Sequence, residues 1–318
     1  TCSRRRIRSK YLRLSPEGES RFVWILSKFS CFCNGNQLDV ADTWCYPINV
    51  AGEGASRQIY LNERGERTMK KAGAIIFVIV VVCLALTIGN LKTYKYADSD
   101  EYRAGDTQIS DAVKDIEINW VAGKVNIVTY NGDDIVLSEE SDRKISEKNK
   151  MRWQLDGNTL RVQYAKSGLF SVNNISKDLT VKLPKSLSLD DVDITVVSAS
   201  VDAEILDADK LKIVTVSGEV AVDGERINKV KADAVSGGMV LRFECVPEKI
   251  DAESVSGNVK IILPEDAGFK AEFDSVSGRM NSAFSMDRTG DDEYTCGDER
   301  CEIDVDTVSG GLVLDVIK

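Results

Sequence analysis

The feature that most constrains this chain is a Val-Ser-Gly tripeptide that recurs at nearly constant spacing. The clear copies contain Ser217, Ser236, Ser256, Ser277 and Ser309, and Val197-Ser198-Ala199 and Val121-Ala122-Gly123 are degenerate copies. From Ser198 the serines advance by 19, 19, 20, 21 and 32 residues, and the step from Ala122 to Ser198 is 76, four times 19. A repeat of this length predicts a stack of small supersecondary units, each too short to fold alone.

The residues around each serine alternate between apolar and polar, as in strands with one buried face. Before Ser217 the apolar or small positions are Leu211, Ile213 and Thr215, and after it they are Val220 and Val222. The buried face therefore changes at the tripeptide, which predicts a corner where glycine supplies the backbone freedom. A row of serines that binds a ligand is the alternative role of the motif. The predicted corner glycines are Gly123, Gly218, Gly237, Gly257, Gly278 and Gly310.

Each unit reads as a strand, a corner, a second strand and a polar return loop such as residues 223–229. Connections between parallel strands are nearly always right-handed. The pattern predicts an all-β fold, a single-domain right-handed β-solenoid (β-helix-like) of about 20-residue coils over residues 111–318. We also expect hairpins that turn at Asn131-Gly132 and at residues 156–158, and a further hairpin within the 32-residue interval.

Residues 72–91 form an uncharged run of 20 residues, long enough at about 1.5 Å per residue to cross a bilayer core. Met69-Lys70-Lys71 supplies the positive flank expected on the cytoplasmic side. This predicts a single-pass transmembrane signal anchor over 69–92, a stalk over 93–110 and an extracytoplasmic C-terminal domain at a bacterial cell membrane. A buried globular helix is the alternative for this run.

Residues 1–68 are basic and aperiodic and carry Cys2, Cys31, Cys33 and Cys45 without a consistent spacing. Because residues 69–71 look like a bacterial start, we expect residues 1–68 to be a non-native or disordered leader. A metal-binding Cys-x-Cys tail is the alternative.

Charge and composition exclude several functions. Residues 97–318 carry 26 basic and 44 acidic side chains, a net charge of −18, which argues against nucleic acid as a partner. The chain contains no histidine, which excludes Ser-His-Asp and Cys-His catalysis and His-ligated metal sites. We therefore predict no enzyme, no catalytic residue, no cofactor and no metal site.

Two further groups of residues were weighed for chemistry. The acidic clusters at 190–193, 207–209, 291–293 and 298–299 match no calcium-binding loop pattern, and whether they bind calcium is left open. Cys296 and Cys301 flank four residues, so a disulfide between them is possible in an oxidising compartment. Cys245 is expected to be a buried strand residue.

Three segments resemble a known family. They are the repeated Thr-Val-Ser-Gly motif, residues 179–194 (LTVKLPKSLSLDDVDI) and residues 261–278 (IILPEDAGFKAEFDSVSG). Over about residues 110–318 the chain is similar to a bacterial family of unknown function known as putative adhesins. The resemblance implies a β-solenoid behind an N-terminal membrane helix, sometimes linked to envelope stress, and implies no catalytic residues.

Together these features predict a membrane-anchored extracytoplasmic binding or structural module, an adhesin of the cell envelope. Its partners would be the membrane, through residues 72–91, and a cell-wall polymer or envelope protein. Two alternatives stay open: a regulatory partner of an envelope-stress sensor, and a carbohydrate-active enzyme built on a β-helix.

Overall fold

The structure is a computed structural model that describes residues 96–168 and 175–318. These residues form 18 strands and one short 3-10 helix, η1 (Glu147–Asn149), so the all-β prediction is confirmed. In the described ranges no helix is long and apolar enough to cross a membrane, and the predicted anchor and leader lie outside them. The strands are β1 (Arg103–Ala104), β2 (Thr107–Ile109), β3 (Asp115–Tyr130), β4 (Ile135–Ser141), β5 (Arg152–Asp156), β6 (Thr159–Gln163), β7 (Lys177–Pro184), β8 (Leu189–Ser217), β9 (Val220–Ser236), β10 (Met239–Phe243), β11 (Lys249–Ser256), β12 (Val259–Leu263), β13 (Phe269–Ser275), β14 (Met280–Ser282), β15 (Asp287–Arg288), β16 (Glu293–Cys296), β17 (Cys301–Thr307) and β18 (Leu312–Val316).

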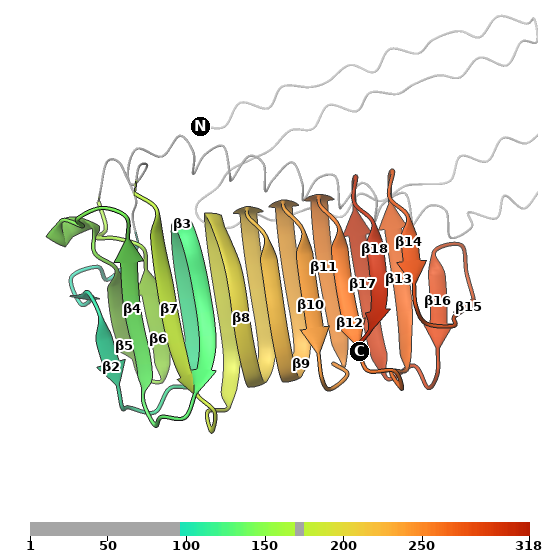
Figure 1. Cartoon of the computed structure of the whole chain (residues 1–318), viewed down its shortest axis with the longest axis horizontal. Helices are drawn as coiled ribbons and strands as arrows, with labels where there is room; N and C mark the ends of the chain where they lie inside the picture. The colour runs from blue at the N-terminus through green and yellow to red at the C-terminus, as the bar shows by residue number, and fades with distance from the viewer. Residues whose placement is uncertain (1–95, 169–174) are drawn as a thin grey trace, which may run out of the picture. The chain divides into compact units, whose positions relative to one another are not determined.

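The repeats stack as parallel rungs, each rung being one copy of the unit (Figure 1). Segments that precede the corner pair with one another, as Leu211 pairs with Val230 and Val230 with Ile250. Segments that follow the corner pair in the same way, as Val201 pairs with Val220. Each step of 19 or 20 residues therefore advances the chain by one rung of a solenoid-like stack. We call the two rows of segments the pre-corner face and the post-corner face.

The core is a column of side chains that point inward from both faces. On the pre-corner face Leu211, Val230 and Ile250 are 1%, 2% and 0% exposed. On the post-corner face Val220 and Val259 are similarly buried. Burying one such aliphatic side chain stabilises the fold by about 1.5–3 kcal/mol. The predicted alternation thus accounts for the core, and the positions between these residues face outward.

The C-terminal rungs do not stack in sequence order. β17 pairs with β11 on one side and with β13 on the other, and β18 likewise lies between β12 and β14. The last rung is therefore inserted between the two rungs that precede it in the chain, which Figure 1 also shows. The extra hairpin expected in the 32-residue interval is β15 with β16, and β16 pairs antiparallel with β13 at the end of the stack.

A strand is also inserted at the N-terminal end. β7 pairs with β3 and with β4, so the hairpin predicted at Asn131-Gly132 is wrong. The hairpin predicted at residues 156–158 is confirmed by the antiparallel pair β5 and β6. The predicted stalk is wrong over residues 103–109, because β1 pairs with β5 and β2 pairs with β4.

The six predicted corner glycines lie where the chain passes from one face to the other. Gly218 and Gly237 have φ of 147° and 125°, in the region that favours glycine. At every one of the six a Cβ would overlap a backbone carbonyl oxygen of an adjacent rung; for Gly257 this is the oxygen of Gly237. All six corners therefore require glycine because adjacent rungs approach closely. At some corners, such as Gly218 and Gly237, a positive φ is a second reason for glycine.

We expect Gly257→Ala to destabilise the fold by about 1–3 kcal/mol, because the new methyl group must displace the Gly237 carbonyl. Urea unfolding would measure the loss. The neighbouring Ser256 side chain is exposed, so Ser256→Ala should change stability by less than about 0.5 kcal/mol. Equal effects of the two substitutions would contradict the close-approach explanation.

Candidate functional site

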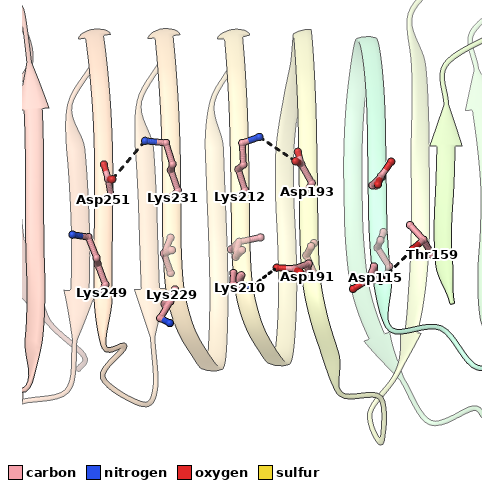
Figure 2. A pocket seen from close by; sticks show the side chains of 15 residues that line it. Asp115, Thr159, Asp191, Asp193, Lys210, Lys212, Lys229, Lys231, Lys249 and Asp251 are labelled. Atoms are coloured by element: carbon pink, nitrogen blue, oxygen red, sulfur yellow. Dashed lines mark hydrogen bonds and ion pairs between the residues drawn. The ribbon is translucent and has the colours of Figure 1, made fainter. Parts of the chain in front are cut away.

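The candidate site is a groove of about 550 Å³ that the pre-corner segments of β3, β6, β8, β9 and β11 line (Figure 2). The side chains that face it come from alternate positions along these strands, as the pleat requires. Five acidic and five basic side chains line it: Asp115, Glu117, Asp191, Asp193, Asp251, Lys210, Lys212, Lys229, Lys231 and Lys249.

Acidic side chains gather at one end of the groove, and the lysines line the rest of it together with Asp251. Asp115 is in register with Asp191, and Glu117 with Asp193, at the end formed by β3 and the start of β8. At the other end Lys210, Lys229 and Lys249 are in register on three successive rungs, and we call them the lysine row. Neighbouring parallel strands lie about 4.8 Å apart, and like charges directly opposite one another are destabilising. The lysine row is thus a local accumulation of positive charge within an acidic domain.

Carboxylates neutralise the lysine row only at its two ends. Lys210 Nζ lies 3.2 Å from Asp191 Oδ1, and Lys249 Nζ lies 3.2 Å from Glu302 Oε1. The central Lys229 is exposed and has no ion pair with any residue that the structure describes. Lys229 is therefore the basic side chain of this row that is left for a ligand.

Two residues further along the same strands, Lys212 and Lys231 both form ion pairs with carboxylates of other rungs. Lys212 Nζ lies 3.1 Å from Asp193, and Lys231 Nζ lies 3.5 Å from Asp251 (Figure 2). Lys231 also lies 3.6 Å from Asp233 and 3.5 Å from Glu253. These contacts hold the wall of the groove in place through bridges between rungs.

Beside the groove, four carboxylates occupy one register position on successive rungs. Asp233 pairs with Glu253, Glu253 with Asp306 and Asp306 with Asp274, and we call them the acidic row. Burial raises the pKa of Asp233 and of Glu253, although Lys231 opposes both shifts. Burial, with repulsion from Asp304, Asp274, Glu253 and Asp251, raises the pKa of Asp306 to about 7. Asp306 therefore takes up a proton near neutral pH.

The acidic cluster at 207–209 forms bridges between rungs. Asp207 accepts a hydrogen bond from Arg226 at 3.1 Å, and Asp209 accepts one from Asn228 at 2.9 Å. In residues 96–168 and 175–318, no group of three or more acidic or cysteine side chains is placed to hold a metal ion.

The predicted disulfide is wrong. Phe269 on β13 is the register partner of Cys296 on one side and of Cys301 on the other, so a whole strand separates the two cysteines. Their Cα atoms are therefore about two strand spacings apart, roughly 9.6 Å, beyond the range of a disulfide. Both are free thiols, and burial raises the pKa of Cys301 to about 12. Cys245, expected to be buried, is exposed just beyond the end of β10.

A fully buried charge lies at the N-terminal end of the stack. The Lys177 side chain is 0% exposed, and its Nζ donates to Glu139 Oε2 at 2.8 Å and to the Asn149 carbonyl at 2.7 Å. The ammonium also donates to the Tyr164 carbonyl and lies 4.9 Å from the centre of the Trp120 ring. Burial lowers the pKa of Lys177, against the opposing effect of Glu139. The network links the inserted β7 to β3 and β4. Because it is buried, its role is to hold these strands together.

Two sets of residues escaped the sequence analysis, although the repeat contained the signal for both. Lys210, Lys229 and Lys249 each stand seven residues before the serine of their own repeat. Hydroxyl residues also recur two positions before the serine. In the structure Ser254 Oγ donates to the Gly257 carbonyl at 3.2 Å, and Thr307 Oγ1 donates to the Gly310 carbonyl at 2.8 Å. Alignment of the repeats on serine would have revealed both rows.

The fold and the groove define an all-β domain of stacked repeats with a charged outer face. The chain belongs to the Toastrack DUF4097 family, whose profile matches residues 113–240 and, in an overlapping second match, 186–314, more than half of the chain. The family resemblance seen in the sequence is thereby confirmed. No curated protein matches the chain.

Several solved structures are similar to this chain at low identity. A "putative cell adhesion protein" from Clostridium sporogenes is 13% identical, with 68% of this chain and 100% of that chain covered and a TM-score of 0.43. A "putative adhesin" from Bacteroides fragilis is 13% identical, with coverage of 67% and 97% and a TM-score of 0.36. A "putative lipid binding protein" from Parabacteroides distasonis is 14% identical, with coverage of 68% and 98% and a TM-score of 0.29.

We expect Lys177→Met to destabilise the fold by about 3–5 kcal/mol, because it leaves the Glu139 carboxylate buried without its partner. Urea unfolding would measure the loss. The double variant Lys177→Met, Glu139→Leu removes both charges and should recover much of the stability. A double variant that is less stable than Lys177→Met would contradict this account.

Stability should fall as the pH rises through neutrality. The pKa of Asp306 is about 7 in the folded protein against an ordinary value of 3.8 for aspartate, so its contribution to stability is fully present below about pH 3.8 and is lost as pH rises through about 7. Thermal melts of the wild type should therefore give a higher midpoint at about pH 5.5 than at about pH 8. Asp306→Asn should reduce this difference, whereas Glu265→Gln, at an exposed turn, should leave it unchanged. An unchanged difference in Asp306→Asn would contradict the assignment.

Proposed function

We propose that this chain is a membrane-anchored module that is displayed outside a bacterial membrane and binds a component of the cell envelope. The uncharged run over 72–91 is the anchor, and the rungs wind as a right-handed β-solenoid. β1 begins at Arg103, so only residues 92–102 separate this run from the first strand.

The observation that carries the binding role is the groove with its unpaired lysine. In a domain of net charge −18, five lysines line one hollow, and the central member of the lysine row has no carboxylate partner in the described part of the chain. An unpaired charged side chain in a hollow of the surface is a candidate contact for a ligand.

The rigid stack supports this role because it fixes the spacing of the outward side chains. Each rung presents its outward residues about 4.8 Å from those of the next, whichever loops vary between rungs. The groove is thus a preformed surface that needs little ordering when a ligand binds.

The proposed topology is tested with a reporter protein fused after Lys318 of the full chain. Because the positive flank at residues 69–71 directs the N-terminus inward, a reporter that is active only outside the cytoplasm should be active, and one that is active only inside should not. Replacement of Ile79 and Val80 by lysine interrupts the uncharged run and should release the fusion from the membrane fraction. A reporter active in the cytoplasm would overturn the proposal that the domain is displayed outside.

A further inference from the structure

We propose that the lysine row binds a single phosphate group, a phosphomonoester, positioned over Lys229. This inference rests on the proposed binding function and names its ligand class. The groove offers Lys229 at the centre, Lys210 and Lys249 on the adjacent rungs, and Lys212 and Lys231 at the next outward position.

The charge distribution around Lys229 favours an anion at this point of the groove. Three ammonium groups stand in register on neighbouring rungs, and only the outer two have a carboxylate within 4 Å. An anion above the central lysine would relieve the repulsion between rungs and would contact more than one ammonium group. Lysine is a common phosphate binder, acting as a compact point charge, and the doubly charged phosphomonoester gains more from several lysines than a carboxylate does.

The acidic residues at the ends of the row limit the size of the anion. Asp191 stands beyond Lys210, and Glu302 stands beyond Lys249. A polyanion laid along the row would meet one of these carboxylates within about two rungs, roughly 10 Å, of Lys229. The row therefore suits one compact anionic group and excludes a nucleic-acid strand.

The side chains are free to rearrange around such a group. The side chains of Lys210 and Lys249 are 54% and 41% exposed, and surface ion pairs of this kind contribute only about 0–1 kcal/mol. A phosphate can therefore replace their carboxylate partners at small cost. Ions screen charges beyond about 8 Å at physiological ionic strength, so the negative charge on distant parts of the domain has little effect at the row.

The inference is tested by thermal melts and calorimetric titrations of the full chain with inorganic phosphate, against sodium chloride at equal ionic strength. Phosphate should raise the melting temperature of the wild type. Lys229→Gln should melt higher than the wild type without phosphate, because a like charge is removed, and should bind phosphate at least tenfold more weakly. Lys185→Gln, at an exposed lysine outside the groove, should behave as the wild type does. Equal binding of phosphate by the wild type and Lys229→Gln would overturn the inference.

The source of the phosphate group is distinguished with two further probes. Glycerol phosphate represents a small or wall-derived ester, and vesicles of phosphatidylcholine with phosphatidic acid represent a lipid headgroup. Binding of either that is lost in Lys229→Gln supports the inference and identifies the source. Failure of all three phosphate probes, with Lys229-dependent binding of isolated envelope fragments, would overturn the phosphate assignment and leave the proposed function standing. Failure of the fragments as well would overturn both binding proposals, whereas the reporter fusion tests the topology separately.

Discussion

Backbone pairing between successive rungs is the interaction on which the rest of the structure depends. It holds only where the chain turns each corner without a side chain between the rungs, and for this reason glycine recurs there. At Gly237 and Gly257 the Cα of one rung lies against the carbonyl group of the preceding rung. Once two rungs are in contact at the corner, the register of the whole rung is set, because the residues that follow can pair only with those directly opposite them.

That register converts the repeat into rows of like residues. Inward rows are apolar and form the core, so similarity between repeats is favourable there. Outward rows bring charges of one sign together, as at Lys210 and Lys229 and again at Glu253 and Asp306. Like charges one rung apart repel, and the chain reduces this repulsion by pairing across rungs and by shifting pKa values. The groove and the acidic row are thus consequences of the same stacking that makes the core.

The two ends of the stack follow a different rule from its middle. An exposed parallel edge has unpaired backbone groups, and at each end a later segment is inserted beside an earlier one. β7 enters between β3 and β4, and Lys177 anchors it there through Glu139. β17 enters between β11 and β13, and β16 covers the outer side of β13. The middle of the stack thus follows sequence order, and its ends do not.

The sequence by itself determined the all-β class, the rung of 19 or 20 residues, the corner positions and the inward faces, because each follows from local periodicity. It also held the outward lysines at a constant repeat position. Only the tertiary structure decided which rungs are neighbours at the ends, that Cys296 and Cys301 lie on opposite sides of β13, and that Lys229 forms no ion pair in the described chain. These facts depend on contacts between segments far apart in sequence, and periodicity contains no information about the order in which such segments pair.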